Sequence, residues 1–194
     1  MGHAPTLTRP DPGAYLDWEA RQQTRSEYLR GEVIAMVGAR RSHVLVAMDL
    51  GFALRQHLRG RPCQVFITDM KLRVEATEAF FYPDVVVTCD PRDAGDEDRF
   101  VAFPKLVVEV LSESTAAFDL GVKLDAYRQL DSLAEYAVVD PDRQIGPVYR
   151  RGTDGRWSLH DSPAGSPLRL ESVDFDIPHA EVFAGVAGPA GRPG

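Results

Sequence analysis

Two short runs of this chain are apolar on both faces, and they restrict its fold more than any other feature. The first is the VVV run at 85–87, and the second is PKLVVEVL at 104–111. A strand without polar alternation is typical of a sheet that is covered on both sides. The sequence therefore predicts buried strands at these two places.

The remaining pattern predicts an α/β or α+β domain with a mixed sheet. We expect helices at 14–24, 42–59 and 119–130 and from about 179, a hairpin at 27–37 that turns at Arg30-Gly31, and strands at 64–66, 69–75, 80–89, 105–111, 135–139 and 147–151. Ser42 is expected to cap its helix, and the helix after 111 should be a crossover between strands. The sheet is expected to continue through Trp157 and 168–170.

The composition predicts one globular domain at 14–185, between flexible tails at 1–13 and 186–194 that are rich in proline and glycine. We expect no membrane span and no signal peptide. Cys63 and Cys89 are too few for a disulfide framework or a cysteine zinc site, so a reduced, cytoplasmic protein is expected. The net charge of −7 opposes non-specific nucleic-acid binding, which would require a local basic patch.

Each apolar strand carries one acid. Asp84 lies at the start of the first, and Glu109 lies within the second, on the face it shares with Lys105, Val107 and Leu111. Neighbouring unpartnered carboxylates repel, and a divalent cation such as magnesium removes that repulsion. The alternative is that each acid pairs with an arginine.

These residues resemble a known family. Asp84 in YPDVVV, Glu109 in PKLVVEVLS and the following STAAFDLGVKLDAYRQL are similar to the Uma-type restriction endonucleases of the PD-(D/E)XK nuclease superfamily. EYLRGEVIAM, His43 and DMKLRV add to the resemblance, which extends from about Tyr15 to Phe183.

The resemblance implies a restriction-endonuclease-like fold, with a central mixed β-sheet flanked by helices and an N-terminal helix and hairpin. It also implies a phosphodiester hydrolase that uses Mg²⁺ (or Mn²⁺) and acts on DNA. Asp84 and Glu109 would be metal ligands, with the Val110 carbonyl as a third. A homodimer would present one site to each strand of a duplex.

The chain departs from the superfamily motif at Leu111, where a lysine is expected two residues after the acid. Two of its three lysines are candidates to replace it. Lys123 is predicted in the first turn of the helix after the Glu109 strand, unless its ammonium merely reaches water. Lys71 is predicted on one strand face with Asp69 and Arg73, where an ion pair with Asp69 is the alternative.

Four residues are candidates for substrate binding: His43, Arg41, Asp69 and Arg73. Arginines around the long helix could contact a phosphate backbone, although a solvated helix face gives the same pattern. The missing lysine leaves two other functions open. One is a catalytically silent nuclease-like module that binds nucleic acid or a protein partner, and the other is a small-molecule enzyme that uses the same carboxylates.

Overall fold

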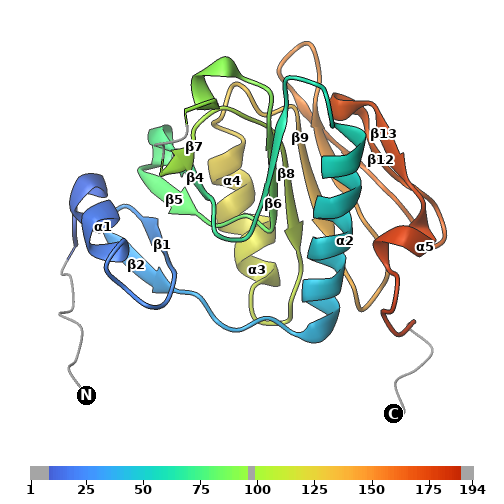
Figure 1. Cartoon of the computed structure of the whole chain (residues 1–194), viewed down its shortest axis with the longest axis horizontal. Helices are drawn as coiled ribbons and strands as arrows, with labels where there is room; N and C mark the ends of the chain where they lie inside the picture. Colours follow the sequence, from blue (N-terminus) through green and yellow to red (C-terminus); the bar gives the residue numbers. More distant parts are fainter. Residues whose placement is uncertain (1–8, 96–98, 189–194) are drawn as a thin grey trace.

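The computed structural model describes residues 9–95 and 99–188 (Figure 1). Its helices are α1 (Pro12–Glu19), α2 (Arg41–His57), α3 (Ala116–Phe118), α4 (Leu124–Tyr127) and α5 (His179–Val182). Its strands are β1 (Ser26–Leu29), β2 (Glu32–Ala35), β3 (Gln64–Ile67), β4 (Lys71–Val74), β5 (Ala79–Phe81), β6 (Val85–Thr88), β7 (Phe100–Val101), β8 (Pro104–Val110), β9 (Glu135–Val139), β10 (Val148–Arg151), β11 (Trp157–His160), β12 (Leu168–Leu170) and β13 (Phe175–Ile177).

The central sheet has the strand order β11-β10-β9-β8-β6-β3. Strands β8 and β9 are parallel and the other neighbours are antiparallel, so the sheet is mixed as predicted. The parallel pair needs a crossover connection, which α3 and α4 supply. A π-helical turn, Asp119–Lys123, joins these two short helices.

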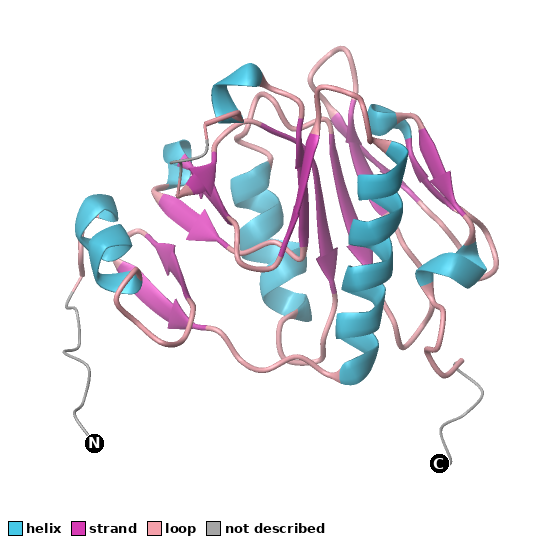
Figure 2. Cartoon of the chain, viewed as in Figure 1, coloured by secondary structure: helices cyan, strands magenta, loops and turns pink. Residues whose placement is uncertain are grey.

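Both faces of the central sheet are covered, which explains why its middle strands lack polar alternation (Figure 2). On one face, Val85 and Val108 pack with Leu50 and Leu54 of α2. On the other face, Val107 packs in a cluster with residues of α4 and of the second sheet. The two apolar runs therefore form adjacent, buried strands.

A second sheet has the order β2-β1-β5-β4-β7 and includes the predicted hairpin β1–β2. The hairpin turns at Arg30 and Gly31, both with positive φ. Tyr28 and Phe80, which lie opposite each other in β1 and β5, pack with Tyr15 of α1. This contact fixes the N-terminal helix and hairpin against the rest of the molecule.

The prediction of a single strand at 80–89 is wrong. The segment forms β5 in the second sheet and β6 in the central sheet, with a break at Tyr82, Pro83 and Asp84. Pro83 has no N–H to donate to a ladder, so the chain can leave one sheet there and enter the other. The break places Asp84 at the mouth of β6.

Several predicted boundaries also move. Arg40, not Ser42, is the N-cap of α2, and it makes no capping bond through its side chain. Asp69 lies in a bend before β4 instead of within the strand. Strand β12 pairs with β13 in a separate sheet, so the central sheet ends at β11. Helix α1 begins at Pro12, and much of the predicted tails at 1–13 and 186–194 lies outside the described residues.

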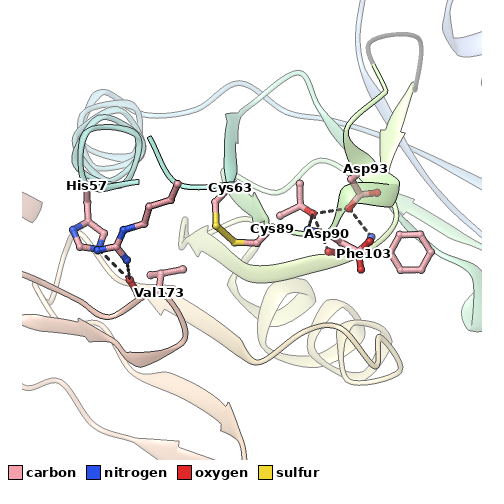
Figure 3. Close-up of a disulfide and its surroundings, with 9 residues drawn as sticks. His57, Cys63, Cys89, Asp90, Asp93, Phe103 and Val173 are labelled. Atoms are coloured by element: carbon pink, nitrogen blue, oxygen red, sulfur yellow. Dashed lines mark hydrogen bonds between the residues drawn. A yellow bond between two sulfur atoms is a disulfide. The ribbon is translucent and has the colours of Figure 1, made fainter. Parts of the chain in front are cut away.

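Cys63 and Cys89 form a disulfide (Figure 3). Gln64 of β3 lies opposite Thr88 of the antiparallel strand β6. Cys63 directly precedes Gln64 and Cys89 directly follows Thr88, so this register brings the two cysteines next to each other. The pair differs from the reduced thiols expected from the sequence. Within the described part of the chain, no helix combines the length and apolarity needed to span a bilayer.

Candidate active site

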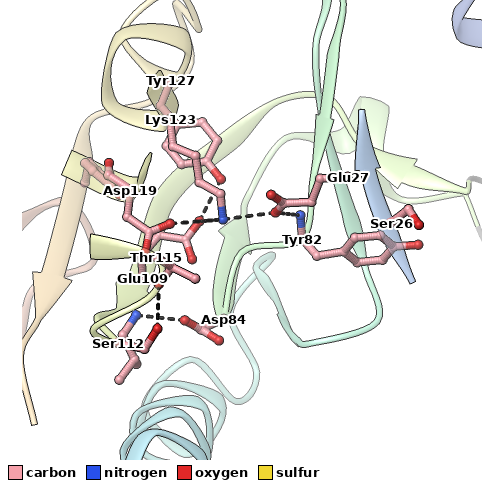
Figure 4. Close-up of polar contacts among 12 residues, drawn as sticks. Ser26, Glu27, Tyr82, Asp84, Glu109, Ser112, Thr115, Asp119, Lys123 and Tyr127 are labelled. Atoms are coloured by element: carbon pink, nitrogen blue, oxygen red, sulfur yellow. Dashed lines mark hydrogen bonds and ion pairs between the residues drawn. The ribbon is translucent and has the colours of Figure 1, made fainter. Parts of the chain in front are cut away.

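Asp84 and Glu109 lie together at the same end of the neighbouring strands β6 and β8 in the central sheet (Figure 4). Val85 of β6 lies opposite Val108 of β8, so the residues next along each strand are Asp84 and Glu109. The Asp84 Oδ2 accepts a hydrogen bond of 2.7 Å from the Val110 N–H. The break before β6 and the register of β8 therefore bring both predicted acids to one place.

Glu109 is a buried carboxylate, with 2% of its surface exposed. Its Oε1 accepts hydrogen bonds from the Tyr127 hydroxyl, at 2.8 Å, and from the Lys123 ammonium, at 3.1 Å. Burial raises the pKa of Glu109 well above its usual range, Lys123 opposes this, and the charges of Asp84 and Asp119 add to it. The surroundings of Glu109 thus hold a surplus of negative charge.

Lys123 lies at the centre of this surplus. Its Nζ is 3.0 Å from Glu27 Oε1, 3.1 Å from Glu109 Oε1 and 3.3 Å from Asp119 Oδ1. Burial alone would lower the pKa of Lys123, but these carboxylates outweigh it and the pKa is raised. Lys123 therefore carries a charge although its side chain is almost fully buried.

The predicted place of Lys123 in the first turn of its helix needs correction. The helical segment begins at Ala116, and Lys123 ends the π-helical turn, so it is not a first-turn residue facing a helix N-terminus. Ion pairs with three carboxylates define its surroundings. The expected proximity to Glu109 does hold in the structure.

Glu27 was missed as a site residue. It lies on β1 and is 6% exposed. Its carboxylate accepts a hydrogen bond of 3.0 Å from the Tyr82 N–H and also forms the ion pair with Lys123. The signal was present in the sequence, because Glu27 is a lone acid in a predicted strand, as Glu109 is. Asp119, which begins the π-helical turn, belongs to the same group.

His43 approaches the acids from the first turn of α2. Its Nε2 lies 2.8 Å from Asp84 Oδ1. Burial would lower the pKa of His43, but the bond to Asp84 and the Asp84 charge outweigh it, so the pKa is raised. Its Nδ1 is buried and finds no hydrogen-bond partner among the residues that the structure describes.

The other candidates lie apart from this group. The predicted alternative of a Lys71–Asp69 ion pair is wrong, because Lys71 pairs with Glu19 at 2.9 Å. Asp69 pairs instead with Arg25 at 3.3 Å, at the rim of the site.

The two candidate arginines also lie outside the carboxylate group. Arg73 pairs with Glu75 and lines a different cavity. Arg41 is exposed at the start of α2.

A cavity of about 660 Å³ opens onto the carboxylates, and Asp84, Glu109, His43 and Lys123 line it. A larger cavity, of about 1120 Å³, has Cys89 and Lys105 in its wall. These two residues lie at the opposite ends of β6 and β8 from Asp84 and Glu109. We therefore treat the smaller cavity as the candidate active site.

The family model described as "Uma2: Putative restriction endonuclease" matches residues 12–177. The chain belongs to the Uma2 family. Two proteins of Synechocystis sp., named as the uncharacterized proteins slr1290 and sll1609, are 34% and 33% identical to it. The first match covers 96% of this chain and 99% of the relative, and the second covers 75% and 82%.

The fold of this Uma2 chain is also similar to that of a solved protein. A crystal structure described as a putative nuclease belonging to DUF820, from Anabaena variabilis, superposes with a TM-score of 0.73 at 17% identity. The match covers 90% of this chain and 98% of that one. The nuclease-like fold expected from the sequence is thereby confirmed.

The side chains in the site suit a hard divalent cation in chemistry and in charge. Asp84 and Glu109 supply carboxylate oxygens, and Glu27 and Asp119 leave the group negative even with Lys123 charged. Within 9–95 and 99–188, no three histidine, cysteine or acidic side chains form a ready metal cluster. Magnesium keeps several of its own waters and needs few ligands from the protein, so two carboxylates and a backbone carbonyl suit it.

Proposed function

We propose that this Uma2 nuclease is a magnesium-dependent endonuclease acting on DNA. The observation that carries the proposal is the convergence of Asp84 and Glu109 beside a buried, charged Lys123. Family and fold supply the nuclease class. The acids supply the reason to expect a metal.

In this proposal Asp84, Glu109 and the Val110 carbonyl hold the ion. A bound magnesium would lower the pKa of a water molecule and stabilise charge on the scissile phosphate. Asp84 is oriented by two hydrogen bonds, from the Val110 N–H and with His43. Lys123 is almost fully buried, where its charge is weakly screened, and it would offset negative charge on the phosphate.

Nicking of supercoiled plasmid tests the proposal. We expect nicking that requires magnesium or manganese and is lost in Asp84→Ala. A parent protein that binds magnesium but leaves plasmid, linear duplex and single-stranded DNA intact would contradict it. If parent and Asp84→Ala nick equally, the site assignment is wrong.

A second function is favoured by one specific observation. An ammonium has three N–H donors, and Lys123 already lies within reach of three carboxylates. Leu111 also occupies the position at which the superfamily motif has its lysine. A catalytically silent module that binds nucleic acid or a partner protein would have these features, and it would bind magnesium without cleaving any DNA.

We also propose a homodimer, since cutting both strands of a duplex requires two sites. Light scattering at working concentration should give twice the mass of one chain. A monomer mass would contradict this, and a monomeric enzyme should accumulate nicked plasmid before any linear product appears.

A further inference from the structure

The wall of the active-site cavity away from the carboxylates is apolar. It includes five hydrophobic side chains that are between 45% and 64% exposed: Met36, Val37, Val44, Met48 and Ile67. They come from the segment after β2, from α2 and from the end of β3. Contiguous exposed apolar surface of this kind marks a binding site more often than a solvated surface.

The size of the cavity suits a small planar group. Its volume of about 660 Å³ lies within the range of about 300–1,000 Å³ typical of small-molecule sites, which combine apolar walls with a few polar groups. Here the polar groups are hydroxyls and carboxylates, including Thr68, Ser112 and Thr115. A nucleobase has the matching chemistry, with apolar faces and a polar edge.

The distribution of charge excludes phosphate from the apolar wall. Among the described residues of this cavity, only Arg25 and Lys123 belong to the permanently charged cationic types. Lys123 is surrounded by carboxylates, and Arg25 pairs with Asp69 at the rim. In the proposed function a phosphate lies at the Asp84 and Glu109 end, held through the bound cation, and the neighbouring base would then contact the apolar wall.

We propose that this cavity receives one unpaired base of the strand being cut, so that the preferred substrate is single-stranded DNA or DNA with an unpaired nucleotide at the cut. The inference rests on the proposed function, because it takes the phosphate to lie at the carboxylates. A base inside an intact duplex is stacked and cannot enter a pocket unless it is flipped out.

A fluorescence titration tests base binding without any need for cleavage. The probe is a single-stranded DNA oligonucleotide with one 2-aminopurine, titrated with the full chain both in EDTA and in calcium, a hard cation that also takes oxygen ligands. We expect its emission to rise as the base leaves its stacked neighbours. Met48→Glu, which places a charge in the apolar wall of the cavity, should weaken binding about tenfold.

Phe52→Glu is the matched control. Phe52 lies one turn further along α2, is 69% exposed, and is not part of the cavity wall. The Phe52→Glu substitution introduces the same charge on the same helix as Met48→Glu, and neither substitution removes a buried side chain. Phe52→Glu should bind the probe like the parent; equal weakening by both variants, or no change in emission with the parent, would overturn the proposal.

Competition separates the possible substrates. Unlabelled single-stranded DNA should displace the probe at lower concentration than the same sequence as a duplex. A duplex that competes equally well would overturn the unpaired-base assignment, and an RNA strand that competes better would overturn the assignment to DNA. Cleavage without base binding would support the proposed endonuclease and overturn the unpaired-base inference. Base binding without cleavage would support the unpaired-base inference and overturn the proposed endonuclease.

Discussion

At the scale of single residues, the distinction between the two lysines is the sharpest test of the site. Lys123→Ala removes the charge among Glu27, Glu109 and Asp119, whereas Lys71→Ala removes one of the two cations that pair with Glu19, the other being Arg25 at 3.7 Å. We expect Lys123→Ala to keep magnesium binding, because the site becomes more negative, and to lose most cleavage. Calorimetry with magnesium and plasmid nicking measure the two effects separately.

Each lysine variant takes one cation away from buried carboxylates, which costs about 3–5 kcal/mol of stability. Thermal melts of the metal-free proteins should therefore show a comparable loss for the two, and they identify any variant that is unfolded. If Lys71→Ala loses cleavage while Lys123→Ala cuts normally, the role belongs to Lys71.

A second residue-scale prediction concerns Asp84→Asn. The change keeps the shape of the side chain and removes a charge that contributes to the raised pKa of Glu109. We expect magnesium affinity to fall by at least about tenfold, because a charged oxygen ligand is lost. Without metal, stability should rise slightly, since repulsion with Glu109 is relieved.

Calorimetry and urea unfolding of Asp84→Asn give these two quantities. A clear loss of metal-free stability would instead mean that Asp84 serves mainly as the ion-pair partner of His43. Unchanged magnesium affinity would remove Asp84 from the metal site.

The sequence predicted the two central acids because both interrupt apolar strands, and a charge in such a place needs a partner. It did not predict Glu27 as a third partner of the site. Glu27 reaches Lys123 through the pairing of β1 with β5, a contact between segments about 50 residues apart in the chain. Local pattern identifies an unusual residue, but long-range strand pairing decides what that residue touches.

At the scale of elements, the position of α2 matters most, because this helix carries His43. Gly51 lies where α2 packs on β3, and a methyl group added there would overlap the Ile67 Cγ2. We expect Gly51→Ala to destabilise the protein by about 1–3 kcal/mol, as overpacking does. Urea unfolding measures this.

Gly121→Ala is the control for this substitution. It lies in the π-helical turn, where an added methyl group meets nothing within 4 Å. Its stability should be unchanged or slightly higher, since alanine favours helix over glycine. A Gly51→Ala variant as stable as the parent would show that α2 can shift away from β3 without cost.

The elements themselves were largely predictable, with instructive exceptions. Strands β8 and β9 and helix α2 follow from apolar runs and periodicity, which are local signals. The division at Pro83 was missed because β5 and β6 are both apolar, and only their partners show that they belong to different sheets. Helix α2 begins without the bond expected from Ser42, since packing against the sheet stabilises it.

At the scale of the whole molecule, the disulfide ties the segment after α2 to the end of β6, with a sequence separation of 26 residues. Closing a loop of this length should stabilise the fold by about 3.5 kcal/mol. We expect a reducing agent to lower the free energy of unfolding by that amount, while Cys63→Ser should be insensitive to reductant. Thiol titration of the unfolded, unreduced parent should find no free thiol, and two free thiols would contradict the pairing.

The placement of Lys123 also bears on how distant relatives of this chain are recognised. In a motif written as an acid, one arbitrary residue and a lysine, Leu111 counts as a defect. Here the ammonium that meets Glu109 stands 14 positions later, on a helix after a connecting loop. Insertions or deletions in that loop could alter the spacing while the two groups stay together, so a search for such enzymes should compare where charges meet in three dimensions instead of demanding a fixed interval along the chain.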